Sequence, residues 1–215
     1  MIDLTSYKKI FGEFATDADF INEIIGNLNL EKDSKILDVG TGLGTMSILL
    51  ALNGFHLLTG EPEVDPEREG EEHHGHYHED NNESHVENNE EHNVAYWIDW
   101  RESAKNLGVE DKIRYQNFDV QSLTFNNQSF DGIFLYDTLQ HVKNREKALK
   151  ECIRVLKNNG VIVIIEWSKK QIEEDFKKYG YKIDYIDPRD FLNRKDILIE
   201  QLNSEVINVY LLRKK

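Results

Sequence analysis

The chain has 215 residues, 39% of them hydrophobic, and carries 26 Lys and Arg against 40 Asp and Glu, a net charge of −14. This length suits one domain, and the acidic balance argues against duplex nucleic acid as a partner, because phosphate binding requires a basic face. A single cysteine excludes an internal disulfide and a cysteine-based zinc site. The sequence shows neither a signal-peptide pattern nor the roughly 20 apolar residues of a membrane span, so we expect a cytoplasmic protein that does not enter membranes.

Helices and short apolar runs alternate along the first 60 residues. Apolar side chains recur at helical spacing within residues 1–30, which predicts an N-terminal helical lid. Residues 35–40 predict a buried strand that ends in a tight turn, residues 45–53 predict a buried helix, and residues 55–59 predict a second strand.

Residues 64–93 interrupt this alternation as an acidic, His-rich insertion. They contain nine Glu, two Asp, one Arg and six His, so they carry −10 of the net charge. A segment this polar cannot bury a core, and we expect it to be flexible. Imidazoles among carboxylates are ligands for Ni or Zn, which makes His73, His74, His76 and His78 candidate metal ligands. A solvated loop, an adventitious metal site and a functional metal-responsive gate all remain open.

The alternation of helices and strands resumes after the insertion. The expected elements are a helix over 96–107, strands over 112–118 and 132–136, a helix over 145–156, a strand over 161–165, a helix over 169–179, and strands over 181–186 and 206–212. We therefore expect one α/β domain over residues 1–215, with a doubly wound, mostly parallel seven-stranded sheet and an antiparallel pair at its C-terminal edge.

A glycine-rich turn follows the first expected strand and reads Asp38-Val39-Gly40-Thr41-Gly42-Leu43-Gly44-Thr45. Glycines permit a sharp turn and the close approach of a ligand at a helix N-terminus. A dinucleotide-binding fingerprint would place its third glycine at Thr45, so a nicotinamide-dependent oxidoreductase is disfavoured. The pattern Asp-x-Gly-x-Gly-x-Gly resembles motif I of the class I S-adenosylmethionine-dependent methyltransferases.

Further segments resemble landmarks of this family in the same order. Glu61 stands where the family has an acid on the ribose hydroxyls, although Asp is commoner there, and Asp119 stands where it has the partner of the adenine amino group. Residues 130–142 resemble the fourth-strand motif, with Gln140 in place of a His, and residues 154–160 resemble the turn before the fifth strand. No Asn/Asp-Pro-Pro-Tyr tetrad follows the fourth strand, which argues against methylation of nucleic-acid bases.

The resemblance implies S-adenosylmethionine as the cofactor and methyl transfer to a small molecule or metabolite. The residues it implies for cofactor binding are Asp38, Gly40, Thr41, Gly42, Gly44, Glu61, Asp119, Val120, Leu135 and Tyr136. Asp137 and His141 are candidate catalytic residues, with a helix cap and a structural histidine as the respective alternatives. The alternative function is a non-catalytic, metal-responsive or metal-carrying protein that uses the insertion.

Overall fold

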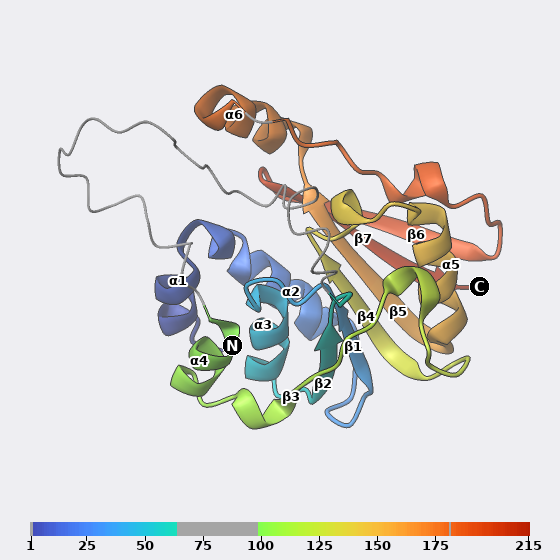
Figure 1. Cartoon of the computed structure of the whole chain (residues 1–215), viewed down its shortest axis with the longest axis horizontal. Helices are drawn as coiled ribbons and strands as arrows, with labels where there is room; N and C mark the ends of the chain where they lie inside the picture. Colours follow the sequence, from blue (N-terminus) through green and yellow to red (C-terminus); the bar gives the residue numbers. More distant parts are fainter. Residues whose placement is uncertain (1, 64–98, 181) are drawn as a thin grey trace.

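A seven-stranded mixed sheet forms the centre of the protein (Figure 1). The structure is a computed structural model and describes residues 2–63, 99–180 and 182–215. In sequence order the strands are β1 Ile36–Val39, β2 Leu57–Gly60, β3 Ile113–Tyr115, β4 Phe130–Tyr136, β5 Leu156–Trp167, β6 Ile197–Asn203 and β7 Ile207–Lys214. Their order in the sheet is β3-β2-β1-β4-β5-β7-β6, with β1 to β5 parallel and β7 antiparallel to both of its neighbours. The predicted fold class is therefore confirmed.

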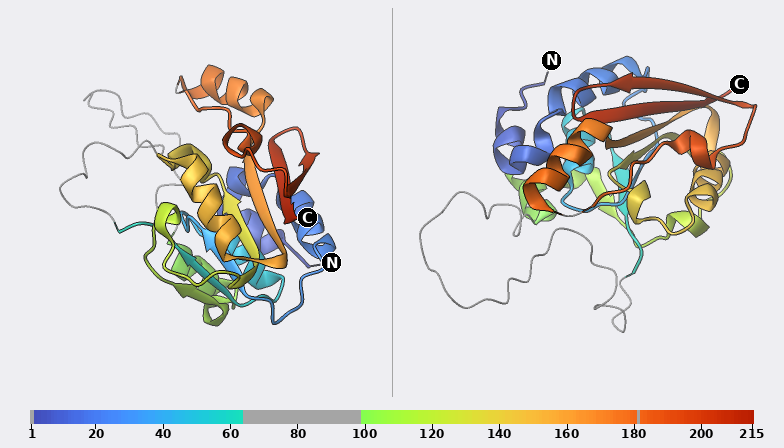
Figure 2. Two further views of the ribbon diagram at one scale, coloured as in Figure 1. Left: turned by 90° about the vertical axis from the view of Figure 1, so that its right-hand side faces the viewer. Right: turned by 90° about the horizontal axis from the view of Figure 1, so that it is seen from above.

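Helices cover both faces of this sheet. The α-helices are α1 Thr5–Phe11, α2 Ala18–Asn27, α3 Thr45–Leu52, α4 Trp100–Asn106, α5 Arg145–Val155 and α6 Lys169–Tyr179. Short 3₁₀ segments are η1 Gly12–Ala15, η3 Glu110–Lys112, η4 Val120–Ser122, η5 Leu139–His141 and η6 Pro188–Phe191. Buried residues of α1 to α4 join one hydrophobic cluster, and those of α5 join a second cluster on the opposite face (Figure 2). Within the described residues, no helix is both long and apolar enough to cross a membrane.

Alternating side chains of the central strands supply both clusters. In β1, Ile36 packs on the side of α1 to α4, whereas Leu37 packs on the side of α5. In β4, Phe134 packs on the side of α1 to α4, whereas Ile133 packs on the side of α5. Because both faces are covered, these strands are apolar almost throughout, which is typical of parallel sheets.

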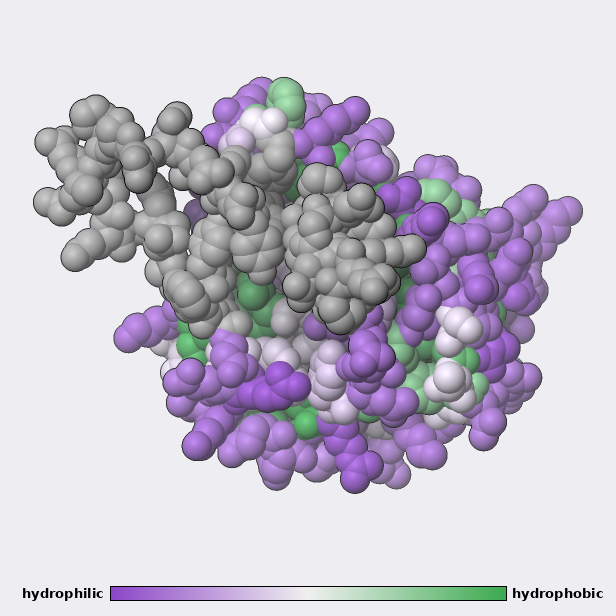
Figure 3. All heavy atoms as spheres, in the orientation of Figure 1, coloured by the Kyte–Doolittle hydropathy of each residue, from purple (hydrophilic) through white to green (hydrophobic). Residues whose placement is uncertain are grey.

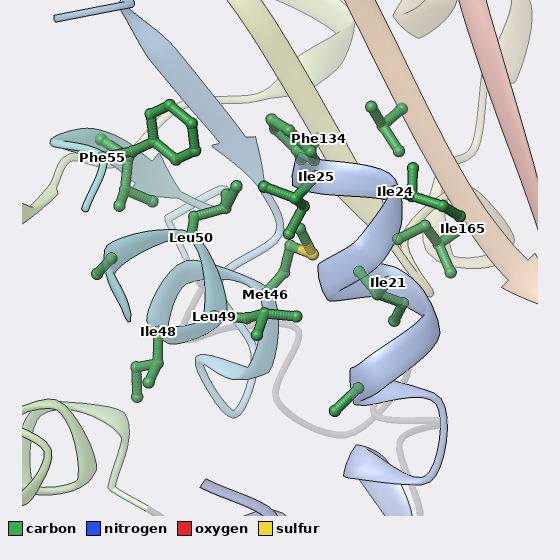
Figure 4. Packing of buried hydrophobic residues seen from close by; sticks show 14 of the residues in the cluster. Ile21, Ile24, Ile25, Met46, Ile48, Leu49, Leu50, Phe55, Phe134 and Ile165 are labelled. Atoms are coloured by element: carbon green, nitrogen blue, oxygen red, sulfur yellow. The ribbon is translucent and has the colours of Figure 1, made fainter. Parts of the chain in front are cut away.

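Helix α3 is buried on nearly all sides, because it lies between the sheet and the neighbouring helices α2 and α4. Met46 of α3 points toward α2, where it lies beside Ile25 (Figure 4). Tyr7 of α1 is also buried, and its hydroxyl donates to the carbonyl of Thr45 at 2.9 Å. The N-terminal helices therefore support the helix that follows the glycine turn.

The expected strand over residues 181–186 was wrong. Residues 182–187 form no strand, and the edge partner of β7 is β6, Ile197–Asn203, which joins β7 through a short hairpin. Tyr185 instead lies near the sheet through its side chain, with its hydroxyl 3.5 Å from that of Tyr210. Strand β3 is shorter than the expected 112–118, and β5 begins earlier than expected, at Leu156.

The surface of the described residues is mostly hydrophilic. On the face in Figure 3, hydrophobic spheres appear only in small patches among polar ones. Large exposed apolar side chains include Phe176 of α6 and Leu198 of the edge strand β6.

Candidate functional site

The glycine turn lies at the carboxyl end of β1 and leads directly into α3. Gly40 and Gly42 have φ angles of +84° and +46°, a left-handed conformation that favours glycine. A Cβ at Gly40 would lie 2.8 Å from the hydroxyl oxygen of Thr138, so this glycine also allows the loop after β4 to pack closely. A Cβ at Gly42 would meet no atom of the described residues within 4 Å. The turn therefore leaves open space beside a helix N-terminus, an arrangement suited to a polar ligand.

Asp38 lies beneath this turn and is 1% exposed. Its Oδ2 accepts hydrogen bonds from the hydroxyls of Ser47 and Thr59, and the Thr59 hydroxyl is 2.9 Å from that of Thr41. Its Oδ1 has no hydrogen-bond partner among the described residues. Burial raises the pKa of Asp38 to about 7, with a smaller contribution from the charge of Glu61, against the hydrogen bonds from the two hydroxyls. A buried acceptor without a partner is costly, so this atom suits a donor from a ligand.

Glu61 follows β2 and reaches back to the glycine turn. Its Oε2 accepts from the Gly42 amide at 3.3 Å, and its carbonyl accepts from the Phe118 amide at 3.1 Å. The side chain is half-buried. A carboxylate here has free lone pairs and can accept from two neighbouring hydroxyls of a ligand.

Asp119 is the N-cap residue of the 3₁₀ segment η4, which begins at Val120 after β3. The Asp119 carboxylate accepts from the backbone amide of Gln121 at 2.8 Å and from its side-chain amide. Val120 is buried in the cluster that also contains Val39 and Leu135. Both residues therefore lie at the same edge of the sheet as the glycine turn and Glu61.

The carboxyl end of β4 lies next to the end of β1. Leu135 is fully buried and paired on both sides within the sheet, so only its neighbours can present side chains to a ligand. Tyr136 is half-buried, and its hydroxyl donates to the carbonyl of Phe14 at 3.2 Å. Asp137 is half-buried with φ +51°, whereas the side chain of His141 is exposed. Asp137 thus directly follows β4, one residue before the Thr138 that packs on Gly40, and His141 is the last residue of η5.

These residues fit S-adenosylmethionine on the chemistry of their donors and acceptors. The strand order reverses between β1 and β4, and ligands of open α/β sheets bind at such a switch point. The glycine turn lies there between the carboxylate of Glu61 and a carboxylate oxygen of Asp38 that has no partner among the described residues. The uncovered backbone of Gly42 leaves the room that a bound ligand needs.

The comparisons with known proteins decide the family. A family profile described as a methyltransferase domain matches residues 12–198. The chain belongs to the class I S-adenosylmethionine-dependent methyltransferases.

Individual methyltransferase relatives match a smaller part of the chain. The ubiquinone/menaquinone biosynthesis C-methyltransferase UbiE of Citrobacter koseri is 36% identical over 89 residues, which are 41% of this chain and 36% of that protein. The matched segment thus spans about a third of the length of these curated relatives.

Solved structures support the fold of the methyltransferase. The PH0226 protein of Pyrococcus horikoshii has a TM-score of 0.61 at 15% identity, with 98% of this chain and 99% of that chain covered. The YcgJ protein of Bacillus subtilis has a TM-score of 0.56 at 16% identity, with 85% and 70% covered.

The candidate metal ligands of the methyltransferase, His73, His74, His76 and His78, lie outside the described residues, as does the whole 64–93 insertion. Within the ranges that are described, no group of three or more His, Cys, Asp or Glu could hold a metal ion. The metal site therefore stays a prediction from the sequence.

Two residues at this edge of the sheet were not identified from the sequence. Glu166, near the end of β5, is 2% exposed and accepts from the Leu139 amide at 2.9 Å. Thr138 donates its hydroxyl toward the carbonyl of Val39 at 2.9 Å and packs on Gly40. The signal for Glu166 was present, because a charged residue directly after an apolar run of five residues marks a strand end in the same way as Asp137 does.

Proposed function

We propose that the protein transfers the methyl group of S-adenosylmethionine to a small-molecule acceptor. The observation that supports this most directly is the glycine turn at the switch point, flanked by Asp38 and Glu61. S-adenosylmethionine, when bound, supplies a methyl group that its sulfonium already makes electrophilic. The protein then has to bind the cofactor, orient the acceptor and exclude water.

The glycine turn, Glu61 and Asp119 bind different parts of the cofactor in this proposal. The turn from Gly40 to Gly44, with Thr41, binds the amino-acid part of the cofactor together with Asp38. Glu61 accepts from the ribose hydroxyls, because its half-buried carboxylate faces the same turn. Asp119 accepts from the adenine amino group, with Val120 beside it.

The acceptor binds beyond the end of β4. Tyr136 and Trp167 form an edge-on aromatic pair there, with ring centroids 6.4 Å apart. Asp137 and His141 are the candidate catalytic groups at this end. Asp137 is the better placed of the two, because it directly follows β4 and adjoins the loop that packs on Gly40.

Calorimetry with S-adenosylmethionine tests the cofactor assignment. Asp119→Ala removes a hydrogen-bond partner and should weaken binding by about 1–3 kcal/mol, or about 5- to 150-fold in Kd. Gly42→Val should abolish binding, because its side chain would fill the space beside the turn and strain the backbone. Asp33→Ala, in the exposed loop before β1, is the matched control and should bind like the wild type. Unchanged affinity in both site variants would refute the proposal.

The acceptor is best sought with a panel of small molecules. UbiE proteins carry the name of quinone-biosynthesis C-methyltransferases, so reduced quinone precursors belong in the panel beside phenols, thiols and amines. Transfer of a radiolabelled methyl group from S-adenosylmethionine identifies the compound that the protein methylates.

A further inference from the structure

Two carboxylates meet at the ends of neighbouring strands on the acceptor side. Asp137 directly follows β4, and Glu166 is the penultimate residue of β5. Parallel pairing of Tyr136 with Ile165 brings the two strand ends together. The ion pairs formed among the described residues involve neither carboxylate. This arrangement differs from the structural carboxylates of the surface, which pair with lysine or arginine.

Glu166 fixes the loop that begins at Asp137. Its carboxylate accepts from the amides of Leu139, at 2.9 Å, and Thr138. Thr138 is fixed in turn on the other side, because its hydroxyl donates toward Val39 and fills the space beside Gly40. The loop is therefore held between a buried carboxylate and the glycine turn of the cofactor site.

Neutral donors hold the carboxylate of Asp137 itself. It accepts from the side-chain amide of Gln140 and from the indole of Trp167. Its backbone amide donates to the carbonyl of Ile165 at 2.9 Å, which maintains the left-handed conformation at φ +51°. Because no cation is among these partners, the carboxylate keeps its basicity while its position is fixed.

The charges around this pair come from four elements. Burial raises the pKa of Asp137 to about 7, Asp175 of α6 adds to the shift, and the two neutral donors oppose it. Burial raises the pKa of Glu166 to about 8, and the charge of Asp137 is the next cause of this rise. The amides of Leu139 and Thr138 and the charge of Arg145 of α5 act in the opposite direction and lower the pKa. Burial also raises the pKa of Tyr136 of β4, with Asp137 and Asp17 adding to it. Negative groups thus predominate around Asp137.

We propose that Asp137 is the proton acceptor of methyl transfer and that Glu166 is the positioning residue that holds it. This proposal rests on the proposed methyltransferase function and narrows its substrates to acceptors whose nucleophilic atom carries a proton at neutral pH, namely a phenolic hydroxyl, a thiol or an ammonium group. The proton passes from this atom to an oxygen of Asp137, and a lone pair of the atom forms the bond to the methyl carbon. The electron pair of the broken carbon–sulfur bond remains on the sulfur, and Asp137 later releases the proton to water.

The test combines a carboxyl titration with kinetics on the full chain. ¹³C NMR of protein labelled at the Asp and Glu carboxyl carbons should show Asp137 titrating near neutral pH, well above the ordinary value of about 3.9. In Asp137→Asn the titration of Glu166 should move to lower pH, because a neighbouring negative charge is lost. Titration of Asp137 at its ordinary pKa would overturn the proposal, whichever acceptor the protein uses.

Kinetics with the panel compound that is methylated fastest supply the second readout. Asp137→Asn should lower kcat by about 10²- to 10⁴-fold, the range for removing a general base, and activity should recover at high pH as the acceptor ionises unaided. Glu166→Gln keeps an oxygen for the Leu139 amide and should keep more activity than Glu166→Ala. Asp190→Asn, on the exposed segment η6, is the matched control.

Calorimetry separates this proposal from the methyltransferase function. The Kd for S-adenosylmethionine should stay within about twofold of wild type in Asp137→Asn, since a contact made only to the acceptor does not contribute to cofactor binding. Failure of the wild type to bind the cofactor would refute the proposed function. Normal cofactor binding with an unchanged kcat and pH profile in Asp137→Asn would refute only the role of Asp137.

Discussion

Asp38→Asn is expected to change how the stability of the cofactor-free protein depends on pH. The wild-type carboxyl has a pKa of about 7 when folded, mainly because it is buried, against an ordinary value of 3.8. A raised folded pKa means that the folded protein binds the proton more tightly than the unfolded chain. The stabilisation that this proton contributes is fully present below the ordinary pKa of the unfolded chain. It is lost as the pH rises through the pKa of the folded protein.

The magnitude follows from the width of this interval. One pKa unit corresponds to about 1.4 kcal/mol, and roughly two units of the shift are titrated between about pH 5 and about pH 8. Wild-type stability should therefore fall, relative to that of Asp38→Asn, by at most about 3 kcal/mol over this range. The amide of Asn does not ionise, while its oxygen still accepts from Ser47 and Thr59.

Urea denaturation followed by tryptophan fluorescence measures this difference, because unfolding free energy falls linearly with denaturant. Asp131→Asn is the control. Burial acts to raise the pKa of Asp131, but the hydrogen bonds from Lys157 and the Lys35 amide, with the lysine charges, lower it overall. Its contribution is lost only in stronger acid, so this variant should differ from wild type by a constant amount between about pH 5 and about pH 8. A constant difference for Asp38→Asn as well would refute the assigned pKa.

Two further results are expected. Gly60→Ala should lower the unfolding free energy by on the order of 4 kcal/mol, because its Cβ would lie 1.8 Å from the backbone oxygen of Gln116. Gly26→Ala in α2 should raise the unfolding free energy by about 0.5–1 kcal/mol, because its Cβ meets no atom of the described residues within 4 Å. Urea denaturation measures both variants, and equal effects would contradict the packing. Calorimetric titration with nickel or zinc should show binding at neutral pH and release at about pH 5–6.5, as protons compete for neutral imidazoles. Metal binding should be lost in the variant in which four histidines are replaced by Ala, namely His73, His74, His76 and His78. If the wild-type protein binds no metal at neutral pH, the insertion is a solvated loop and not a metal site.

The strands that are covered on both faces were predictable from the sequence. Residues 35–40 and 161–165 are apolar runs with glycine beside them, and both lie in central strands of the sheet. The local sequence pattern is enough to identify these strands. A strand that is buried on both faces is a short continuous apolar run, so its prediction does not depend on an alternation of apolar and polar residues.

The edge strand could not be found in the same way. Residues 181–186 alternate apolar and polar side chains as a half-buried strand does, whereas β6, Ile197–Asn203, begins with three apolar residues and then has two polar ones. Local alternation therefore favours the segment that forms no strand. The short hairpin decides the pairing, since Ser204 accepts from the amides of Val206 and Ile207 and closes the turn between β6 and β7. This contact depends on where the chain turns, and the pattern of apolar and polar residues within a strand does not predict the position of the turn.

The grouping of the candidate cofactor-site residues could be predicted from the sequence, because they all stand at the ends of predicted strands. Asp38, Glu61, Asp119 and Asp137 each lie at or just after the end of a predicted strand, and parallel strands bring their ends to one edge. What the sequence could not show is how these groups are satisfied. The hydroxyls that bind Asp38, and the amides that bind Glu166, come from residues distant in the chain.

Among the described residues, the three carboxyls whose pKa burial raises into the neutral range, Asp38, Asp137 and Glu166, all lie at this edge of the sheet. A protein selected only for stability would gain by replacing such groups with neutral ones, because ionising a buried carboxylate without a cation is costly. Asp131, at the opposite end of β4, shows the stabilising arrangement, with Lys157 beside it. The free-energy cost of burying these three carboxyls therefore falls at the edge of the sheet where a ligand can offset it. A hydrogen-bond donor or a proton delivered to this edge stabilises the same carboxyl oxygens that burial destabilises.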